Sequence, residues 1–449
     1  MNPPLAPRQR EPRENTIGNM KIWYLNPYAG GPGVGSAWRA YYLCREFDRS
    51  GNAATVITAS YHHLLEADVE QPSDRLVEGV RYVAVPARRY LGNGLGRILN
   101  MLQYALGVAR LHRDVPQRLD APDAIIVSSP HPFAYISAWL LARRFGCRLA
   151  FEVRDIWPLS LKVILGLPTW HPLVVACAWL ERFAYRTADL VVSLLAGADR
   201  YILEIGMTPK RFFWAPNGVV EDGEQPEKTI KSEAGRHVAV LMDRWRAEGR
   251  CILIYAGTIG PPNGVDVLVE ALGVLKAKPS ANSIGVLIIG KGVSAGAIAE
   301  RVDALQLDSV EVSPAVTRGE ALALMAKADM AYAGGRSLNA IYKYGTSVNK
   351  VMDYMMTGLP VVFPHYAYKG PISESGAGIQ LDDGTPENVA EAISAIASLP
   401  ETERREMGAR GRRYVREQFM WRDVAAGYVA ALAGPERSAE AGPEVPLTR

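Results

Sequence analysis

The chain has 449 residues, which is more than one hydrophobic core usually organises, so two domains are expected. Hydrophobic residues make up 48% of the sequence and charged residues 22%, a composition typical of a soluble globular protein. The formal net charge of +3 is too small to indicate nucleic-acid binding, and we expect no nucleic-acid partner.

The sequence pattern predicts neither a signal peptide nor a membrane span. Residues 1–19 are rich in Pro, Arg and Glu without an apolar centre, which predicts a disordered extension. The most apolar region, 161–180, is interrupted by a lysine, a histidine and two prolines, whereas a span needs about 20 unbroken apolar residues. We expect a cytoplasmic protein that at most lies on the inner face of the cytoplasmic membrane.

The four cysteines are scattered in or beside apolar runs, at positions 44, 147, 177 and 251. Their spacing is typical of neither metal ligands nor a disulfide framework. We therefore expect buried free thiols in a reducing compartment, and no metal site.

The first half of the chain alternates predicted strands and helices. Strands are expected at 20–25, 54–58, 82–85, 124–127, 149–153, 190–194 and 212–220. Helices are expected at 37–47, opened by Ser36, and at 94–111, 135–145 and 173–187. This alternation predicts a parallel sheet with helices on both faces.

The polar stretch 221–236 is the best candidate for a domain boundary, because the strand–helix pattern restarts after it. Strands are then expected at 251–256, 286–289, 310–312, 331–333, 361–363 and 378–381, and helices at 265–276, 386–398 and 404–418. The sequence therefore predicts an N-domain at 20–220 and a C-domain at 221–420. The segment 421–449 would hold a helix that packs back toward the N-domain, followed by a frayed tail.

The stretch 342–362 reads as a polar loop, a short helix and a buried strand. Thr346 or Ser347 is expected to cap the helix, and Gly358 to end it. A helix start presents free N–H groups and the positive end of the dipole, which suit a phosphate. Lys350 and Asp353 share one face near that start and would hold a diphosphate and a ribose. A capped surface helix with a salt bridge is the alternative.

Three glycine-rich turns follow predicted strands, at 30–35, 257–260 and 290–292. Open parallel sheets bind ligands beyond the carboxyl ends of their strands, where glycine lets the backbone approach a phosphate or sugar closely. The first turn lacks the G-x-G-x-x-G spacing, and no Walker loop occurs in the sequence. We therefore expect no nicotinamide, flavin or other cofactor.

Glu152, Arg154 and Asp155 gather at the end of an otherwise apolar predicted strand. Facing a cleft, they would supply a general base and a clamp for phosphate or sugar oxygens. An internal ion-pair network that holds the loop is the alternative. His131, flanked by prolines, either faces the same cleft or packs as a structural residue.

Together these motifs resemble glycosyltransferase family 4, from Met20 to about Leu432. The matching features are the glycine turn at 30–35, Asn217-Gly-Val219, Ala256-Gly-Thr-Ile-Gly260, the donor-binding E-x7-E-like segment at 345–353 and the Trp421 helix. Stretches 151–158 and 347–354 are most similar to transferases that build O-antigen and capsule repeats. Among these, N-acetyl-L-fucosamine transferases are the nearest type.

The resemblance implies the GT-B fold, in which two facing Rossmann-like, doubly wound parallel-sheet domains enclose an interdomain cleft. It implies a hexosyltransferase-type, metal-independent enzyme of surface polysaccharide synthesis. The donor would be a nucleotide-diphosphate sugar. Its expected nucleotide is UDP, and its expected sugar is an N-acetylated deoxyhexose. The acceptor would be lipid-linked or a saccharide.

The chain departs from the family pattern in the E-x7-E segment. Asp353 occupies the second acidic position, which holds the nucleotide ribose, but Gly345 occupies the first. Arg154-Asp155 stands where many family members carry a His-Asp pair.

The family's Arg and Lys that grip the diphosphate are replaced by Thr258 or Ile259 and by Asn263. Lys350 is therefore expected to supply the missing charge, with Arg336 or Lys291 in support.

The resemblance and the local patterns together define an expected site. Its donor-binding residues are Gly33, Gly35, Ser36, Gly257, Thr258, Gly260, Gly290, Lys291, Gly345, Ser347, Val348, Asn349 and Asp353. Its catalytic residues are Glu152, Arg154, Asp155, His131 and Lys350. In this hypothesis Lys350 neutralises the leaving group, backbone donors at 33–36 face the leaving phosphate, and Glu152 or Asp155 activates the acceptor hydroxyl.

Two further questions stay open at this point. A series of N-domain arginines, at positions 88, 89, 97, 110 and 113, either lies on anionic headgroups or forms a solvated helix face. The competing functions are a nucleotide-sugar epimerase of the same architecture and a non-catalytic nucleotide-sugar-binding subunit.

Overall fold

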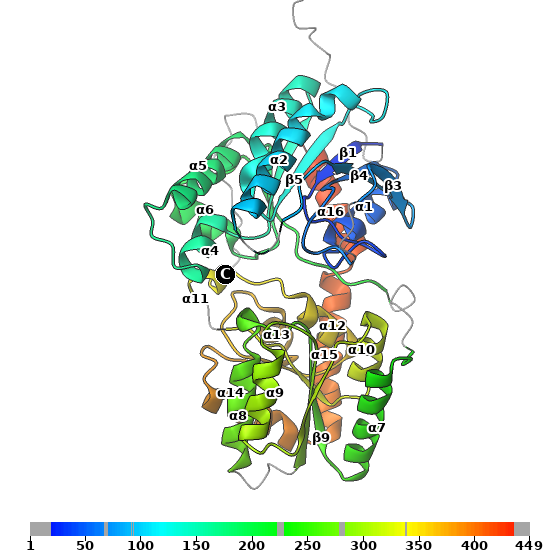
Figure 1. The fold of residues 1–449 in the computed structure, drawn as a ribbon, viewed down its shortest axis with the longest axis vertical. Helices are drawn as coiled ribbons and strands as arrows, with labels where there is room; N and C mark the ends of the chain where they lie inside the picture. The colour runs from blue at the N-terminus through cyan, green and yellow to red at the C-terminus, as the bar shows by residue number, and fades with distance from the viewer. Residues whose placement is uncertain are drawn as a thin grey trace, which may run out of the picture.

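The computed structural model describes residues 19–66, 71–90, 92, 94–221, 229–277, 283–336 and 339–434. The expected disordered extension and the frayed tail therefore lie almost wholly outside the described residues. Figure 1 shows the described chain as two lobes stacked along the long axis, with the N-domain above the C-domain. The expected fold class is confirmed, because each lobe is an α/β domain built on a mainly or wholly parallel sheet.

The N-domain sheet has the described strand order β3-β4-β2-β1-β5-β6-β7-β8. The strands are β1 (Lys21–Leu25), β2 (Ala53–Ala59), β3 (Asp74–Val77), β4 (Val80–Val85), β5 (Ala124–Ser129), β6 (Arg148–Val153), β7 (Leu190–Ser193) and β8 (Phe212–Trp214). The central strands are buried along most of their length, as expected of a sheet covered on both faces. Only β3 pairs in antiparallel fashion, with β4 at the edge.

The helices of the N-domain connect these strands and cover the sheet. They are α1 (Arg39–Arg49), α2 (Leu95–Arg110), α3 (Tyr135–Phe145), α4 (Trp157–Ile164), α5 (Pro172–Thr187) and α6 (Ala198–Glu204), with short 3₁₀ turns η1 (Leu111–Asp114) and η2 (Pro132–Ala134). Helix α3 contacts both α2 and α5 on one side of the sheet, and α1 packs against α16 (Trp421–Ala433) on the other side (Figure 1).

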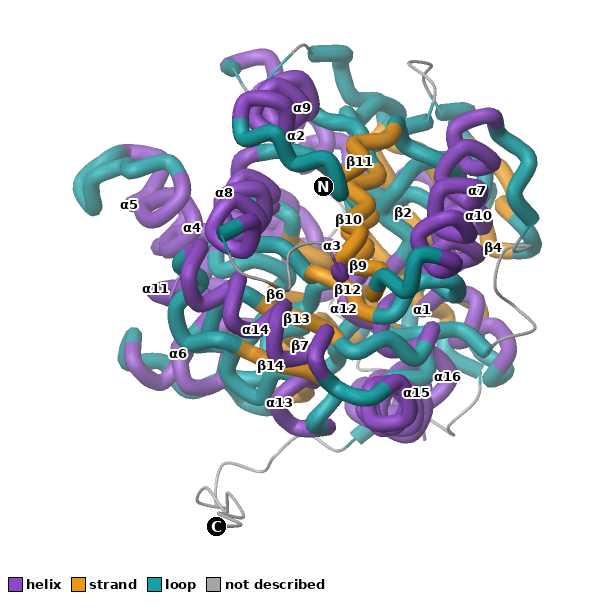
Figure 2. Tube along the Cα trace, turned by 90° about the horizontal axis from the view of Figure 1, so that it is seen from below, coloured by secondary structure: helices purple, strands orange, loops and turns teal. Residues whose placement is uncertain are grey.

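The C-domain sheet has the described strand order β11-β10-β9-β12-β13-β14, all parallel. Its strands are β9 (Cys251–Ala256), β10 (Ile284–Ile289), β11 (Val310–Ser313), β12 (Met330–Tyr332), β13 (Val361–Phe363) and β14 (Gly378–Gln380). Its helices are α7 (Glu233–Ala247), α8 (Val265–Lys276), α9 (Ala295–Ala304), α10 (Arg318–Met325), α11 (Asn339–Tyr342), α12 (Asn349–Thr357), α13 (Pro371–Ser375), α14 (Pro386–Ser398) and α15 (Glu401–Gln418), with the 3₁₀ turn η4 (Pro261–Asn263). Figure 2 shows the strands in a row between α8 and α9 on one side and α7 and α10 on the other.

The chain returns to the N-domain after α15, so the domains are joined by two crossings. Trp421 at the start of α16 stacks on Tyr42 of α1, with ring centroids 5.4 Å apart. The Val219 N–H donates to the Phe419 carbonyl at 2.7 Å, which fixes the two crossings side by side. These contacts place α16 in the N-domain although it is the last described helix in the sequence.

One local prediction is wrong at a helix start. Ser36 does not open α1, which begins at Arg39 without a side-chain cap. The stretch predicted as a domain boundary contains the start of α7, because the Ser232 hydroxyl accepts the Gly235 N–H and caps that helix. Capping residues are frequent in loops, and tertiary packing decides which of them begins a helix.

We expect two glycine-to-alanine substitutions on C-domain helices to have opposite effects on stability. A Cβ at Gly408 of α15 would lie 1.8 Å from the Gly358 carbonyl oxygen, so Gly408→Ala should lower the free energy of unfolding by about 2 kcal/mol. A Cβ at Gly296 of α9 meets no atom within 4 Å, so Gly296→Ala should be neutral or raise it by up to about 1 kcal/mol. Urea unfolding followed by circular dichroism measures both, and equal stabilities would contradict the close packing of α15 on the turn after α12.

Candidate active site

The carboxyl ends of two N-domain strands and the C-domain loop before α12 meet at a cavity of about 240 Å³, named here the interdomain cavity. The N-domain contributes Arg154 and Asp155, directly after β6, and Leu194 after β7. The connection between the domains contributes Asn217. The C-domain contributes the loop before α12, through Gly345, Thr346, Ser347 and Asn349. A cavity with this location is where open parallel sheets bind ligands.

The loop before α12 is held against the N-domain. The Tyr344 side chain is buried beside Tyr201 of α6, with ring centroids 5.3 Å apart, and its carbonyl accepts the Gly197 N–H at 2.9 Å. Lys343 forms an ion pair with Glu204 at 3.1 Å. The loop therefore bridges the two domains at one side of the interdomain cavity.

Gly345 cannot carry a larger side chain in this arrangement. Its φ of +99° is rarely adopted by other residues, and a Cβ would lie 2.9 Å from the Ala196 nitrogen. The contact explains physically why the first acidic position of the E-x7-E pattern is a glycine here. Gly345 lines the cavity through its backbone alone.

Helix α12 begins at Asn349 with no side-chain cap, so the expected capping role of Thr346 or Ser347 is wrong. The Ser347 hydroxyl instead accepts the Asn217 N–H at 3.1 Å, and its carbonyl accepts the Asn217 side-chain amide at 3.2 Å. The Val351 N–H donates to the Val348 carbonyl at 3.1 Å, which leaves the N–H groups of Asn349 and Lys350 without a partner within the helix. Val348 precedes this turn, and Asn349 lines the cavity.

Lys350 points toward the turn that follows β9. Its Nζ donates to the Asn263 Oδ1 at 3.0 Å and to the Tyr255 hydroxyl at 3.1 Å, and lies 4.6 Å from the centre of the Tyr255 ring. Burial lowers the pKa of Lys350 to about 8. Among the residues that the structure describes, no carboxylate pairs with it. Lys350 thus brings positive charge to the position where the sequence replaces the expected lysine by Asn263.

The predicted donor-binding turns after β9 and β10 pack together. The Gly257 N–H donates to the Ile289 carbonyl at 3.0 Å, and the Ile259 N–H to the Lys291 carbonyl at 2.9 Å. A Cβ at Gly290 would lie 1.9 Å from the Gly257 carbonyl oxygen, so this close approach requires glycine. Thr258 and Lys291 are exposed, and Gly260 leads into η4. Their contact with a donor stays a prediction.

Two charged residues proposed for the donor are already paired. The Asp353 carboxylate accepts from Arg318 of α10 at 2.7 Å, so its expected bond to a ribose would share that carboxylate with an arginine. Arg336 pairs with Asp266 at 2.7 Å and donates to the Pro261 carbonyl, which removes it as the main source of positive charge.

The turn at 30–35 does not present the backbone donors expected of it. The Gly35 N–H donates to the Gly31 carbonyl at 3.3 Å, and the Ser36 N–H to the Leu64 carbonyl at 3.1 Å. Gly33 is exposed with a φ of +62°, at the tip of the turn. The expectation that Gly35 and Ser36 face a leaving phosphate through their N–H groups is therefore wrong, because the carbonyls of Gly31 in the same turn and of Leu64 already accept from them.

Glu152 is buried in the N-domain, and its expected role as a cleft-facing base is also wrong. Its carboxylate accepts from Arg39 at 2.8 and 3.1 Å, from Tyr24 at 2.6 Å and from Ser128 at 2.7 Å. Burial alone would raise the pKa of Glu152, but the Arg39 guanidinium, together with the hydrogen bonds from Tyr24 and Ser128, holds that pKa below its usual value. Of the predicted charged cluster, only Arg154 and Asp155 line the interdomain cavity.

Sequence reasoning missed Arg39 and the way it connects Glu152 to the cavity. Besides Glu152, Arg39 donates to the Ala215 and Pro216 carbonyls at 2.8 and 2.9 Å and to the Asn217 Oδ1 at 3.3 Å. Asn217 in turn holds Ser347. An arginine among the apolar positions of a predicted helix was the only available signal.

His131 lies buried in an aromatic environment and is not among the residues that line the interdomain cavity. Its ring is 5.7 Å from Tyr28, 5.5 Å from Phe133 and 6.4 Å from Trp157, centre to centre. Burial lowers the pKa of His131 to about 3, so the ring is neutral at physiological pH. Neither ring nitrogen has a hydrogen-bond partner among the described residues, which is unusual for a buried polar group. His131 therefore cannot act as a cationic acid, and its contact with a ligand stays a prediction.

The described chain contains no cluster of three or more His, Cys, Asp or Glu side chains arranged to hold a metal ion. No helix of the described chain is both long enough and apolar enough to cross a membrane.

We expect Glu152→Gln to act on stability rather than on chemistry. It leaves Arg39 as a buried, uncompensated charge, which should cost about 3–5 kcal/mol of unfolding free energy. The matched control is Glu270→Gln, which breaks an exposed pair with Arg301 at 2.6 Å and should cost less than about 1 kcal/mol. Urea unfolding measures both variants. Wild-type stability in Glu152→Gln, combined with lost activity, would restore the catalytic role.

Comparison with protein-family models supports the reading of the two domains. Residues 34–218 match a family described as glycosyl transferase 4-like domain, and residues 250–398 match a family described as glycosyl transferases group 1. No curated protein matches the chain at a significant level.

Solved structures show the same fold at low identity. A sucrose-phosphate synthase from Thermosynechococcus elongatus is 16% identical with a TM-score of 0.66, covering 91% of this chain and 97% of that one. Anabaena HepE, solved with UDP and glucose, is 14% identical with a TM-score of 0.62 and coverages of 92% and 99%. WaaG, a glycosyltransferase involved in lipopolysaccharide biosynthesis, is 15% identical with a TM-score of 0.63 and coverages of 92% and 100%. With its two matched domains and its two facing parallel sheets, the chain is a glycosyltransferase of the family 4, GT-B type.

Proposed function

We propose that the protein transfers a sugar from a UDP-linked donor to a lipid-linked or saccharide acceptor in surface polysaccharide synthesis. The observation that carries the donor class is Lys350, a largely buried ammonium group with no carboxylate partner among the described residues, next to the uncapped start of α12. A diphosphate would supply the missing negative charge. HepE, solved with UDP and with UDP-glucose, provides an example of this fold with such a ligand.

In the proposed reaction the diphosphate lies over the first turn of α12. The N–H groups of that turn and the Lys350 ammonium neutralise the charge that develops as the nucleoside diphosphate leaves. Asp353 orients the ribose, and its bond to Arg318 would hold the carboxylate in one position. The residues themselves supply this charge stabilisation, so the proposed transfer is metal-independent.

The acceptor would approach from the N-domain side of the interdomain cavity. Asp155 is the carboxylate at the end of β6 that lines this cavity, and we assign it the role of base for the acceptor hydroxyl. Arg154 would bind acceptor or phosphate oxygens. The neutral His131 would bond a sugar hydroxyl through a ring nitrogen that otherwise lacks a partner.

A lipid-linked acceptor places the enzyme at the inner face of the cytoplasmic membrane. The N-domain exposes aromatic side chains that a purely aqueous protein would rarely leave uncovered: Trp170 is 77% exposed and Trp179 of α5 is 57% exposed. Tryptophan favours the interface between headgroups and water. An N-acetylated deoxyhexose is the first sugar to test, because stretches 151–158 and 347–354 resemble transferases of that type.

A screen of nucleotides and nucleotide sugars by thermal shift tests the donor class. UDP and its sugars should raise the unfolding temperature, since a ligand at 100 times its dissociation constant stabilises by about 2.7 kcal/mol, whereas ADP and GDP should not. Release of UDP should then require a lipid-linked or saccharide acceptor. Acceptor-independent turnover would indicate an epimerase or hydrolase, and UDP binding without turnover would indicate a non-catalytic subunit.

We expect Lys350→Met to weaken UDP binding by about 1.5–3 kcal/mol, because it removes one charged hydrogen bond to the diphosphate. In the wild type, affinity should fall as pH rises from 7 to 9, because the ammonium, whose pKa burial lowers to about 8, loses its charge over this range. The variant should lack this slope. Isothermal titration calorimetry at several pH values measures both effects.

The matched control is Lys276→Met, on the exposed end of α8, where Nζ donates only to backbone carbonyls. It should retain both the affinity and its pH dependence. Equal UDP affinity in Lys350→Met and the wild type would remove Lys350 from the donor site.

A further inference from the structure

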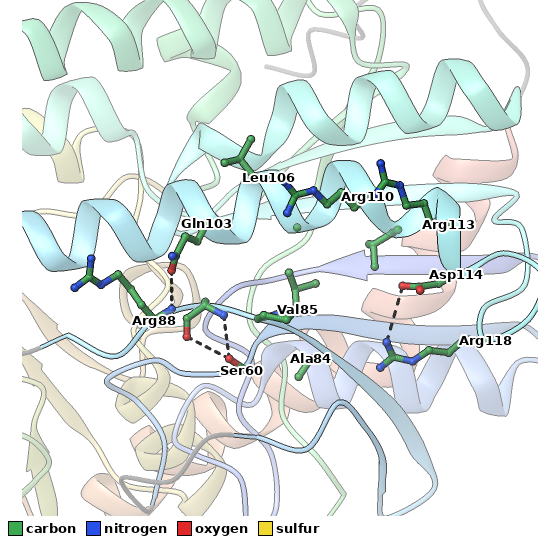
Figure 3. Close-up of a pocket in the computed structure, with 14 residues that line it drawn as sticks. Ser60, Ala84, Val85, Arg88, Gln103, Leu106, Arg110, Arg113, Asp114 and Arg118 are labelled. Carbon is green, nitrogen blue, oxygen red and sulfur yellow. Dashed lines mark hydrogen bonds and ion pairs between the residues drawn. The ribbon is translucent and has the colours of Figure 1, made fainter.

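A second large hollow lies on the N-domain, away from the interdomain cavity. It has a volume of about 560 Å³ and runs between β4 and α2, and we name it the β4–α2 groove. A Cβ at Gly107 of α2 would lie 2.1 Å from the Val85 Cγ1, so a glycine allows the helix to approach the strand at the floor of the groove. Figure 3 shows Arg88 at one end of the groove and Arg113 and Arg118 at the other.

The groove carries more positive charge than the protein itself neutralises. Arg88, Arg110 and Arg113 line it with exposed side chains, and their guanidinium groups form no ion pair within the described part of the chain. Arg118 differs, because it lies 3.9 Å from Asp114 and 3.7 Å from Asp74. Three unpaired arginines around one hollow favour a ligand with oxyanion groups, which planar guanidinium groups bind through paired hydrogen bonds.

The helix that forms one wall of the groove also has an uncovered apolar stripe. Leu95, Leu99, Leu102 and Leu106 of α2 are 78%, 45%, 43% and 59% exposed. Their spacing of three and four residues places them on one face of the helix. Arg110 follows Leu106 by one turn, so the leucine stripe ends at the charged groove.

We propose that the β4–α2 groove binds the phosphate headgroup of an anionic membrane lipid, whose apolar chains meet the leucine stripe of α2. The site rests on the proposed function only in that a lipid-linked acceptor would bring the enzyme to a membrane. A nucleotide is a poor fit, because no aromatic ring lines the groove to stack on a base. An acidic saccharide would leave the exposed leucines uncovered, whereas a lipid satisfies both the arginines and the leucines.

Co-sedimentation of the full chain with vesicles tests this site. The protein should bind phosphatidylcholine vesicles that contain phosphatidylglycerol, and bind pure phosphatidylcholine weakly. Arg110→Gln combined with Arg113→Gln should lower partitioning to the anionic vesicles at least about tenfold, since each basic residue near such a surface contributes a several-fold factor. Leu99→Gln combined with Leu102→Gln should also lower it, because exposed leucines contribute through their apolar contact.

The control for net charge is Arg244→Gln combined with Arg413→Gln, two exposed arginines on C-domain helices. This variant should partition like the wild type. Equal loss in the control and the groove variant would show a general effect of charge and overturn the site. Inorganic diphosphate that binds the groove without any vesicle binding would overturn the lipid assignment.

The two proposals can fail separately. Lys350→Met should keep wild-type vesicle binding, and the arginine variant should keep the UDP-induced thermal shift of the wild type. Vesicle binding that depends on the groove would support the lipid site even if no nucleotide sugar binds. If the protein self-associates and does not bind vesicles, the leucine stripe contacts a second copy of the chain, and the proposal is overturned.

Discussion

The ion pair between Arg39 and Glu152 is the interaction on which the arrangement of the two domains depends. Both side chains are buried, and their closest atoms are 2.8 Å apart. Glu152 belongs to a central strand of the N-domain, whereas Arg39 also donates to the Ala215 and Pro216 carbonyls of the interdomain connection. An arginine has five donors and no acceptor, so one residue can hold the sheet and the connection together. A buried charge of this kind is tolerated only while its partners stay in place.

The same network reaches the cavity between the domains. Arg39 bonds the Asn217 side chain, and Asn217 donates to both the hydroxyl and the carbonyl of Ser347. Ser347 is therefore not free to cap α12, and the start of that helix stays uncapped beside Lys350. Gly345 allows the loop to lie against the N-domain, where any side chain would collide with the backbone at Ala196. Structural demands thus determine several residues that a family pattern would assign to the ligand.

The two proposed binding regions follow one electrostatic principle. In each, positively charged side chains form no ion pair with a carboxylate in the described part of the chain: Lys350 beside the α12 start, and three arginines in the β4–α2 groove. Elsewhere, charged residues such as Arg336 and Arg318 are paired with carboxylates at 2.7 Å. Positive charge without a carboxylate partner favours an anionic ligand, because the ligand supplies the ion pair that the described chain does not.

The sequence by itself determined the fold class and the order of most strands along the chain, because apolar periodicity and glycine-rich turns are signals of neighbouring residues. It did not distinguish a catalytic Glu152 from a structural one, since the partner, Arg39, is 113 positions away. It also assigned Ser347 to a local cap, whereas its hydroxyl bonds Asn217, 130 positions away. Only the tertiary structure decided these roles, because the partner of a buried polar group depends on which distant segments pack together.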